Sequence, residues 1–464
     1  GGGPAGMGAA IAAAEAGASV MLVEHEPELG GHLRWGGADD LAAIAELVSA
    51  VESHPGIEVL TDSTVTGRYD HNWIAVMQRS HEIAPERLIK ARAASLVVAP
   101  GLIERPYVFA GNDTPGVMLS GAVRRLINLW AVKPGTKAVV LSANPEGEAA
   151  IADLESAGVK IVAALDVWAG EDVVEVEGKG RVEKVILGDG RTVSADLVVI
   201  GTGWTAPTSL LNMAGDRPVY DPSAARYFSN HLPDNVLATG GITGNGTTAE
   251  LVAHGRATGS LSASRALRVR HDRRVLAARA RNPEGPKPES LQDTRTPLAR
   301  VPHPECYRSS THGMVDLSED VSSKDLVQAK KEGFDSIELM KRYTTVTMGP
   351  SQGKLETVNA AAVLAEARDM DMADIGTTVW RPPYAPISLG ALAGRIFEPI
   401  RRSALQDWHE AHGASPLLAG QWVRPDHYGD PVGEASNVRE NVGIIDVTPL
   451  GKLDLRGPDV TKLL

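Results

Sequence analysis

The sequence predicts an α/β protein built from successive parts, the first of which contains a parallel sheet. The chain opens on GGGPAGMGAAIAAAEAG, a glycine-rich turn that leads into a helix and then into the apolar run 19–23. A second strand–helix–strand pattern covers 137–166, and apolar strands end in glycine at 95–101, 195–203 and 235–241. Strands that alternate with helices are typical of a parallel sheet.

The composition is that of a globular chain, and its 464 residues allow two to four domains. The net charge of −12 argues against a nucleic-acid partner, which would need a basic face. No apolar run is long enough to span a bilayer. The single cysteine, Cys306, excludes intrachain disulfides and multi-cysteine metal sites. We therefore expect no metal site, and we take the cytoplasm as the default location.

The opening residues 1–6 have the G-x-G-x-x-G spacing of a dinucleotide-binding turn. Glycines let the backbone approach a pyrophosphate, and the following helix offers free N–H groups at its positive end. Glu24 ends the next strand and would accept hydrogen bonds from a ribose diol. Its neighbours His25 and Glu26 supply no arginine for a 2′-phosphate, which disfavours NADP. The strand that should feed this turn would precede residue 1, so we expect a fragment of a longer chain.

The order of parts over about 1–270 resembles the two-dinucleotide-domain, Rossmann-type flavoprotein fold of glutathione reductase. In that fold the last strand usually ends in Gly-Asp, and the aspartate binds the ribityl chain of FAD. Here the strand ends Thr239-Gly240-Gly241. We therefore favour NAD over FAD in the first site and keep FAD as the alternative. The second turn, at 142–147, lacks the glycine triplet, which argues against a second nucleotide there.

A linker rich in proline and polar residues is predicted over 282–304, and a compact helical segment over 305–356. In that segment Ser322 marks one helix start, Gly333 marks its end, and Asp335 indicates a second capped helix.

The helical segment is similar to the small domain that carries a [2Fe–2S] cluster in bacterioferritin-associated ferredoxin and several amine dehydrogenases. The four thiolates are absent, and the matching places fall at 315–317 and 350–352. We expect the scaffold without its cluster. Lys341, Arg342, Thr344 and Thr345 form a cationic, hydroxyl-rich patch suited to a phosphate, with a solvated helix end as the alternative.

Residues 379–464 resemble the start of the glycine-cleavage aminomethyltransferase family, which has a folate-binding fold. The stretch VRENVGIIDVTPLGKLDLRGPD carries the resemblance. Only the first part of such a domain is present, and most residues that would hold folate are expected beyond Leu464.

Together the parts resemble the alpha subunits of heterotetrameric sarcosine oxidases, most specifically in AGNDTPGVMLSGAVRRLI, SIELMKRYTTVTMGPSQGK and VRENVGIIDVTPLGKLDLRG. The resemblance implies that a beta subunit carries FAD and oxidises sarcosine, and that an FMN between alpha and beta reduces oxygen to hydrogen peroxide. It also implies gamma and delta partners, transfer of the imine carbon to tetrahydrofolate, and an NAD in this chain that does not turn over. The implied domains are 1–281, with a central insert at about 130–205, then 282–304, 305–356 and 379–464.

The resemblance also implies the site residues. The NAD contacts map to Gly1, Gly3, Pro4, Ala5, Gly6, Glu24, His25, Gly31, Leu33, Pro100 and Gly241. The FMN contacts map to Lys341, Arg342, Thr344, Thr345 and Gln352. His32 and His254 are isolated in glycine-rich segments and are interpreted as loop or packing residues. We therefore expect no catalytic residue for amine oxidation in this chain and a structural role for NAD.

Two other functions are compatible with the sequence. One is a self-sufficient FAD-dependent amine or opine dehydrogenase subunit, which Gly241 and the missing cysteines disfavour. The other is a non-redox, folate-linked module that keeps NAD as a structural ligand, which would leave the 341–345 patch without a role. The sequence does not distinguish sarcosine from other N-methyl amines.

Overall fold

The computed structural model describes residues 1–464 except 80, 280–292, 294, 308–311 and 395–397. The chain divides into two compact units, each described by itself below. The first comprises Gly1–Asp272 and Glu289–Ser388, and the second comprises Arg273–Pro288 and Leu389–Leu464. The predicted linker falls partly outside the described residues, because 282–292 and 294 are among the gaps.

The first unit begins with the predicted helix and strand and continues through a three-stranded antiparallel sheet, β3–β4–β5. Its opening elements are α1 (Pro4–Glu15), β1 (Val20–Val23), η1 (Gly31–Trp35), α2 (Ala38–Glu52), β2 (Ile57–Leu60), β3 (Ser63–Tyr69), η2 (Asp70–Asn72), β4 (Trp73–Arg79), β5 (Glu86–Arg92), β6 (Leu96–Val98) and β7 (Ile103–Glu104). The elements that close this region are β15 (Trp204–Thr205), α5 (Ser209–Asn212), β16 (Val219–Asp221), β17 (Arg226–Phe228), β18 (Val236–Ala238), η4 (Gly240–Ile242) and α6 (Thr248–Arg279).

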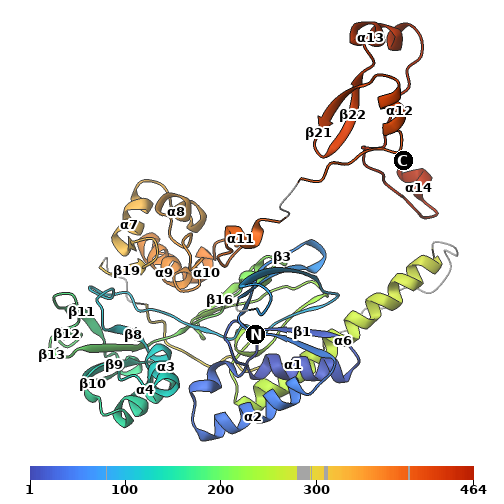
Figure 1. Cartoon of the computed structure of the whole chain (residues 1–464). Helices are drawn as coiled ribbons and strands as arrows, with labels where there is room; N and C mark the ends of the chain where they lie inside the picture. Colours follow the sequence, from blue (N-terminus) through green and yellow to red (C-terminus); the bar gives the residue numbers. More distant parts are fainter. Residues whose placement is uncertain (80, 280–292, 294, 308–311, 395–397) are drawn as a thin grey trace. The chain divides into compact units, whose positions relative to one another are not determined.

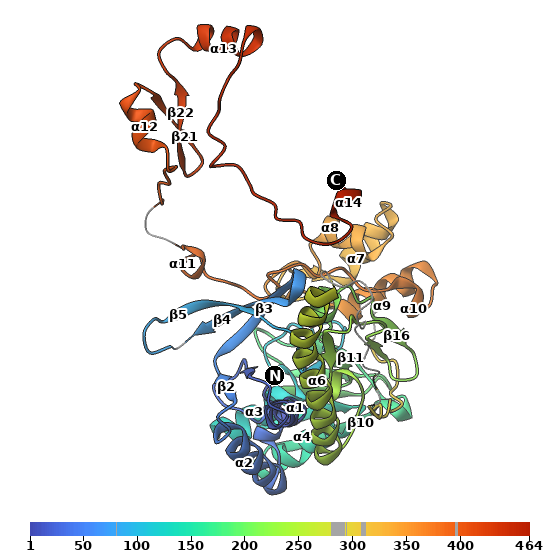
Figure 2. The ribbon, with the colours of Figure 1, turned by 90° about the vertical axis from the view of Figure 1, so that its right-hand side faces the viewer.

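Helix α1 is buried along nearly its whole length because its side chains are small. Only Glu15 at its end is exposed. Two glycines of α6, Gly255 and Gly259, let that helix approach the α1 backbone, since a Cβ at either position would collide with the carbonyl of Ala5 or Ala9. Figures 1 and 2 show α1 and α6 side by side. The alanine-rich sequence thus determines a close helix contact beside the opening turn.

Two short pairs of parallel strands flank α1. Strand β1 pairs with β2, and β6 pairs with β18. A cavity of about 690 Å³ is lined by β1, by β6 with its flanking residues, and by the small side chains of α1. The strand predicted to precede residue 1 stays a prediction.

A four-stranded parallel sheet, in the order β10–β9–β14–β8, forms the second strand–helix–strand region. Its elements are β8 (Val117–Leu119), α3 (Ser120–Trp130), β9 (Lys137–Ser142), α4 (Pro145–Ser156), β10 (Lys160–Asp166), η3 (Val167–Ala169) and β14 (Leu197–Gly201). An antiparallel sheet of β11 (Val173–Glu177), β12 (Lys184–Leu187) and β13 (Thr192–Ser194) follows β10 in the chain. An Asp189-Gly190 turn joins β12 to β13, with Gly190 at φ +85°.

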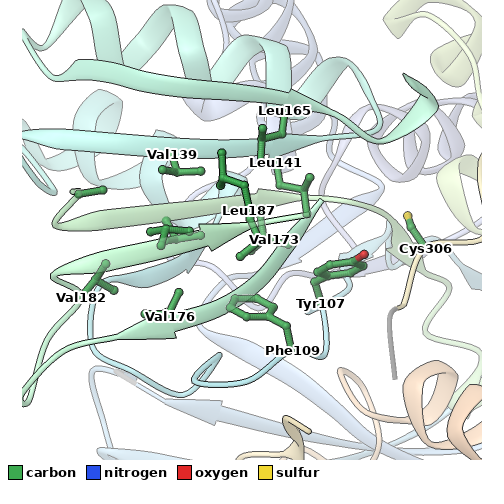
Figure 3. Packing of buried hydrophobic residues seen from close by; sticks show 14 of the residues in the cluster. Tyr107, Phe109, Val139, Leu141, Leu165, Val173, Val176, Val182, Leu187 and Cys306 are labelled. Atoms are coloured by element: carbon green, nitrogen blue, oxygen red, sulfur yellow. The ribbon is translucent and has the colours of Figure 1, made fainter. Parts of the chain in front are cut away.

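A hydrophobic core lies between these two sheets (Figure 3). Val139, Leu141 and Leu165 contribute from the parallel sheet, and Val176 and Leu187 contribute from the antiparallel one. Cys306 lies at the edge of this core, and its thiol donates to the carbonyl of Thr202. Burial raises the pKa of that thiol, so Cys306 is a packing residue.

The small helical segment of the first unit has its own core. Its elements are β19 (Met314–Asp316), β20 (Val321–Ser322), α7 (Ser323–Lys331), α8 (Ile337–Thr344), α9 (Thr357–Arg368) and α10 (Met372–Ile375). The predicted start of α7 is confirmed by a capping box between Ser322 and Asp325. The second cap is corrected: Ser336, not Asp335, accepts the N–H of Leu339, because the hydroxyl oxygen sits at the N-cap position.

Among its described residues, the second unit contains the end of α6, a hairpin and four short helices. These elements are α11 (Leu389–Leu392), α12 (Gln406–Ala411), β21 (Ser415–Ala419), β22 (Trp422–His427), α13 (Pro431–Glu440) and α14 (Val460–Leu463). His409 of α12 is held between two partners, the hydroxyl of Tyr428 at 2.6 Å and the carboxylate of Asp446 at 3.2 Å. The Ser403 hydroxyl and the Thr448 hydroxyl and amide lower the pKa of Asp446.

Within the described ranges, every helix is too short or too polar to cross a membrane.

Candidate functional site

The predicted dinucleotide turn is a tight cradle in which each glycine meets another segment. A Cβ at residue 1 would strike the carbonyl of Ala99, and one at Gly6 would strike the carbonyl of Gly1. Gly3 is the N-cap of α1 and Pro4 its first residue, so the N–H groups of the first turn have no partner inside the helix. The turn therefore leaves backbone donors for an anion at the positive end of a twelve-residue helix.

Glu24 lies directly under this turn. One carboxylate oxygen accepts the N–H of Gly2, and the other accepts the N–H of Glu26 at 2.8 Å. The side chain is buried, and β1 positions it. Because a carboxylate can accept about four hydrogen bonds, Glu24 retains capacity for two ribose hydroxyls.

The other predicted NAD residues are distributed around the same turn. Gly31, at φ +58°, packs against Gly3, and a Cβ there would come within 2.9 Å of the Gly3 Cα atom. Leu33 is buried two residues further on in η1. Pro100 follows Ala99, which contacts residue 1. His25 is exposed, and its Nδ1 atom pairs with the Thr64 hydroxyl at 2.8 Å.

The end of β18 reaches the turn through a neighbouring glycine. Gly240, at φ +78°, lies close to Ala5, whereas Gly241 packs near Leu102. Thr239 is fully buried, and its hydroxyl pairs with Nδ1 of His254 at 2.7 Å. Burial lowers the pKa of His254, which agrees with its interpretation as a packing residue.

Two arginines from other elements, Arg34 of η1 and Arg125 of α3, lie beside this site. Arg125 of α3 donates from one guanidinium nitrogen to both carboxylate oxygens of Glu26 at 3.0 Å, and Arg34 of η1 lies 3.5 Å from the same carboxylate. The expectation against NADP rested only on the immediate chain neighbours of Glu24. Arg125 is 99 residues away from Glu26 in the chain, so no local signal could have found it.

The second crevice, at the carboxyl ends of β9 and β10, differs from the first. Asn144 caps α4 by accepting the N–H groups of Glu146 and Gly147 at 3.1 and 3.2 Å. Glu146 and Glu148 add negative charge to the first turn. A cavity of about 510 Å³ adjoins this end of the sheet. The N–H groups at the start of α4 are already capped, and the acids beside them would repel a pyrophosphate. This agrees with the prediction that the turn at 142–147 holds no second nucleotide.

A mostly buried carboxyl group joins the two strand–helix regions. Glu104 of β7 accepts the hydroxyl of Ser120, and it accepts the N–H of Gly121 at 2.7 Å. Desolvation, together with the nearby Glu146, raises the pKa of Glu104 to about 7, against the effects of its two donors and of Arg124. This carboxyl group therefore titrates near neutral pH.

The predicted FMN residues share the last turn of α8 and the loop after it, but each is engaged within the chain. Arg342 contacts Glu338, at 2.8 Å to its carbonyl and 3.1 Å to its carboxylate. Lys341 reaches the carbonyl of Val379 at 3.4 Å, and burial lowers its pKa. The remaining hydroxyl and amide donors bond to nearby carbonyls, as seen for Thr344, Thr345 and Gln352.

One of the two places that would carry cluster thiolates, 315–317, is linked by Asp316 to the loop after α8. Asp316 is fully buried, and its carboxylate accepts three backbone N–H groups, from Ser318 at 2.9 Å, Glu319 at 3.1 Å and Thr347 at 2.8 Å. Among the described residues no set of three metal-ligating side chains is found. The Asp316 carboxylate thus joins the end of β19 to the loop after α8, and the likeness of this segment to a cluster-binding domain stays a prediction.

Three family models match this chain. Residues 1–87 match the FAD dependent oxidoreductases, 310–395 match the sarcosine oxidase A3 domain, and 405–464 match the GCVT N-terminal domain.

Among curated relatives, the sarcosine oxidase alpha subunits of Rhizobium meliloti (strain 1021) and Corynebacterium sp. (strain P-1) are 33% and 32% identical to this chain. Each match covers 100% of this chain, and 50% and 53% of the relative, so the chain spans about half their length. An opine oxidase subunit of Rhizobium meliloti (strain 1021) is 25% identical over 85% of this chain and 98% of its own length. The L-proline dehydrogenase of P. horikoshii shares the fold, with a TM-score of 0.65 and 23% identity over 84% of this chain and 78% of the other.

The fold and these matches define a chain with a Rossmann-type flavoprotein fold, followed by a helical region similar to the sarcosine oxidase A3 domain and a segment similar to the start of an aminomethyltransferase domain. The resemblance to the alpha subunits of sarcosine oxidase, first drawn from three sequence motifs, is confirmed along the whole chain.

Proposed function

We propose that this chain serves in the alpha subunit of a sarcosine oxidase that works as a complex with beta, gamma and delta subunits. In the proposed reaction sarcosine, oxygen and tetrahydrofolate yield glycine, hydrogen peroxide and 5,10-methylenetetrahydrofolate. Amine oxidation belongs to FAD in the beta subunit, so this chain needs no acid or base directed at the amine. Its own tasks are to bind NAD as a structural ligand, to help hold FMN and to lead into the folate domain.

One observation carries the NAD assignment: Glu24 lies beneath the glycine turn, with both carboxylate oxygens oriented by Gly2 and Glu26. That arrangement suits an adenosine ribose next to a pyrophosphate at the N-terminus of α1. At the end of β18, Gly241 supplies no carboxylate for a ribityl chain. The chain's residues orient and retain the dinucleotide, and its binding would stabilise the folded state by mass action.

The FMN contacts are proposed at Lys341, Arg342, Thr344, Thr345 and Gln352. The positive charges of Lys341 and Arg342 suit a phosphate. To bind it, Arg342 would have to leave its ion pair with Glu338. Bound FMN would pass electrons from the reduced FAD of the beta subunit to oxygen. The domain boundaries 1–281, 282–304, 305–356 and 379–464 are part of this proposal.

A second candidate is an FAD-dependent amine or opine dehydrogenase subunit. The likeness to the opine oxidase subunit, which spans nearly that whole relative, favours it. The two candidates differ in substrate and in nucleotide, since the second requires FAD in the first site.

The test is an assay of the assembly that is isolated through a tag on this chain. The proposal predicts peroxide formation that depends on sarcosine, and suppression of free formaldehyde when tetrahydrofolate is added. Oxidation of an opine but not of sarcosine would support the second candidate and contradict the first.

A further inference from the structure

We propose that Glu26 determines the nucleotide choice of the first site. By pairing with Arg34 and Arg125 it withholds both guanidinium groups from a 2′-phosphate, so that the site takes NAD and rejects NADP. This inference rests on the proposed NAD site.

Glu26 is fixed beside the carboxylate that would hold the ribose. Its N–H donates to Glu24, and its carbonyl accepts the N–H of Asp62 at 3.1 Å. These two backbone bonds attach Glu26 to the end of β1 and to the start of β3. If Glu24 holds the ribose, a phosphate on the 2′-oxygen would lie next to the Glu26 side chain.

The two arginines reach Glu26 from different elements. Arg34 comes from η1, the helix whose first residue packs against the glycine turn, and it also pairs with Glu28 at 2.7 Å. Arg125 comes from α3, and its guanidinium lies 5.0 Å from the ring centre of Trp35. Each arginine is therefore held by a second contact that does not involve Glu26. Removing the Glu26 charge would leave two oriented guanidinium groups, the donors best suited to phosphate.

The local charge explains the rejection. Arg34 and Arg125 carry +2 and Glu26 and Glu28 carry −2, so this group sums to zero, and Glu24 adds a further negative charge. A 2′-phosphate brings about −1.5 to −2 at neutral pH. In the native site it meets carboxylates whose cations are already paired. In Glu26→Gln the same group sums to +1, which balances the charge of Glu24, and both guanidinium groups can turn to the phosphate.

The test uses the full chain in its assembly, isolated in buffer that contains equal concentrations of NAD and NADP. After washing and denaturation, the released nucleotides are quantified by mass spectrometry. Glu26→Gln is expected to raise the NADP-to-NAD ratio at least tenfold over the native chain. Glu28→Gln is the matched control: it raises the local charge by the same amount but leaves both arginines paired with Glu26, so the ratio should rise much less than in Glu26→Gln. An equal rise in the two variants would show that charge alone, and not the pairing by Glu26, sets the choice. Glu26→Gln combined with Arg125→Ala should bring the ratio back down.

An unchanged ratio in Glu26→Gln that still retains NAD would overturn the inference and leave the proposed function intact. Native chain that releases FAD or no nucleotide would instead overturn the proposed function. If Glu26→Gln does not fold, competition at the native site decides. Adenosine 2′,5′-bisphosphate is expected to displace NAD at least tenfold less well than 5′-AMP, and equal competition refutes the role of Glu26.

Discussion

The backbone N–H of Thr347 donates to the fully buried carboxylate of Asp316 over 2.8 Å, joining the loop after α8 to the end of β19, 31 residues earlier in the chain. Ser318 and Glu319 donate to the other oxygen of that carboxylate. The A3 region therefore has a hydrogen-bonded centre that holds the end of β19 to the loop after α8.

Replacing Asp316 should destabilise the helical segment. Asp316→Ala removes the acceptor of three backbone N–H groups, of which that of Thr347 is buried and those of Ser318 and Glu319 are partly buried. A buried N–H left unpaired costs about 1–3 kcal/mol. Asp316→Asn keeps one acceptor oxygen and should lose less. Thermal unfolding, followed by tryptophan fluorescence, should give melting temperatures that fall in the order native, Asp316→Asn, Asp316→Ala. Asp320→Asn, at an exposed position, is the control. Equal melting temperatures for all four proteins would remove Asp316 from this role.

A methyl group in the opening turn should abolish nucleotide retention. In Gly6→Ala the new Cβ would overlap the carbonyl of Gly1, so the turn must open and its donors lose their alignment. We expect at least a tenfold drop in nucleotide released per chain. Gly37→Ala is the matched control, since a Cβ there meets nothing within 4 Å. Full nucleotide occupancy in Gly6→Ala would show that this turn is not the binding cradle.

Stability should depend on pH through Glu104. Its pKa is raised from 4.5 to about 7 in the folded chain, so the folded state binds more protons than the unfolded state between these values. This contribution is fully present below pH 4.5 and is lost as the pH rises through 7. Between pH 5.5 and 8 the loss is about 2 kcal/mol, at 1.36 kcal/mol per pKa unit.

Glu104→Gln removes this titration and should flatten the decline, as calorimetry at the two pH values would measure. Glu155→Gln, an exposed acid at the end of α4, serves as the control. A decline in Glu104→Gln as steep as that of the native chain would contradict the assignment.

In the second unit, Asp446 should hold His409 and the extended segment that follows α13. The two side chains are 6% and 7% exposed and lie 3.2 Å apart. Asp446→Asn weakens a charge-assisted contact and should lower the free energy of local opening by about 1.4 kcal/mol. Because proteolysis follows the population of the open form, cleavage within 389–464 should become about tenfold faster. Asp454→Asn, whose partner Arg456 is exposed, should not change the rate. Should both variants be cleaved at the native rate, the Asp446 contact contributes nothing to local stability.

Local sequence signals predicted the elements but not the contacts between distant segments. The turn–helix–strand of residues 1–24 and the capping box of α7 are local, so spacing and cap chemistry were enough. The second cap was misplaced by one residue, because Asp335 and Ser336 are both good N-cap residues and only the backbone distinguishes them.

The approach of Arg34 and Arg125 to Glu26 depends on how η1 and α3 meet. The role of Asp316 likewise depends on a loop that returns after two helices. Neither relationship has a signature in the sequence, because the partners are set by tertiary packing.

The most direct test of the account is the identity of the nucleotide that this chain holds. The chain is purified without partners and denatured, and the released nucleotide is identified by mass and counted per chain. We expect close to one NAD per chain and no FAD. FAD in place of NAD would mean that Gly241 does not exclude a flavin, and that this chain carries redox chemistry of its own.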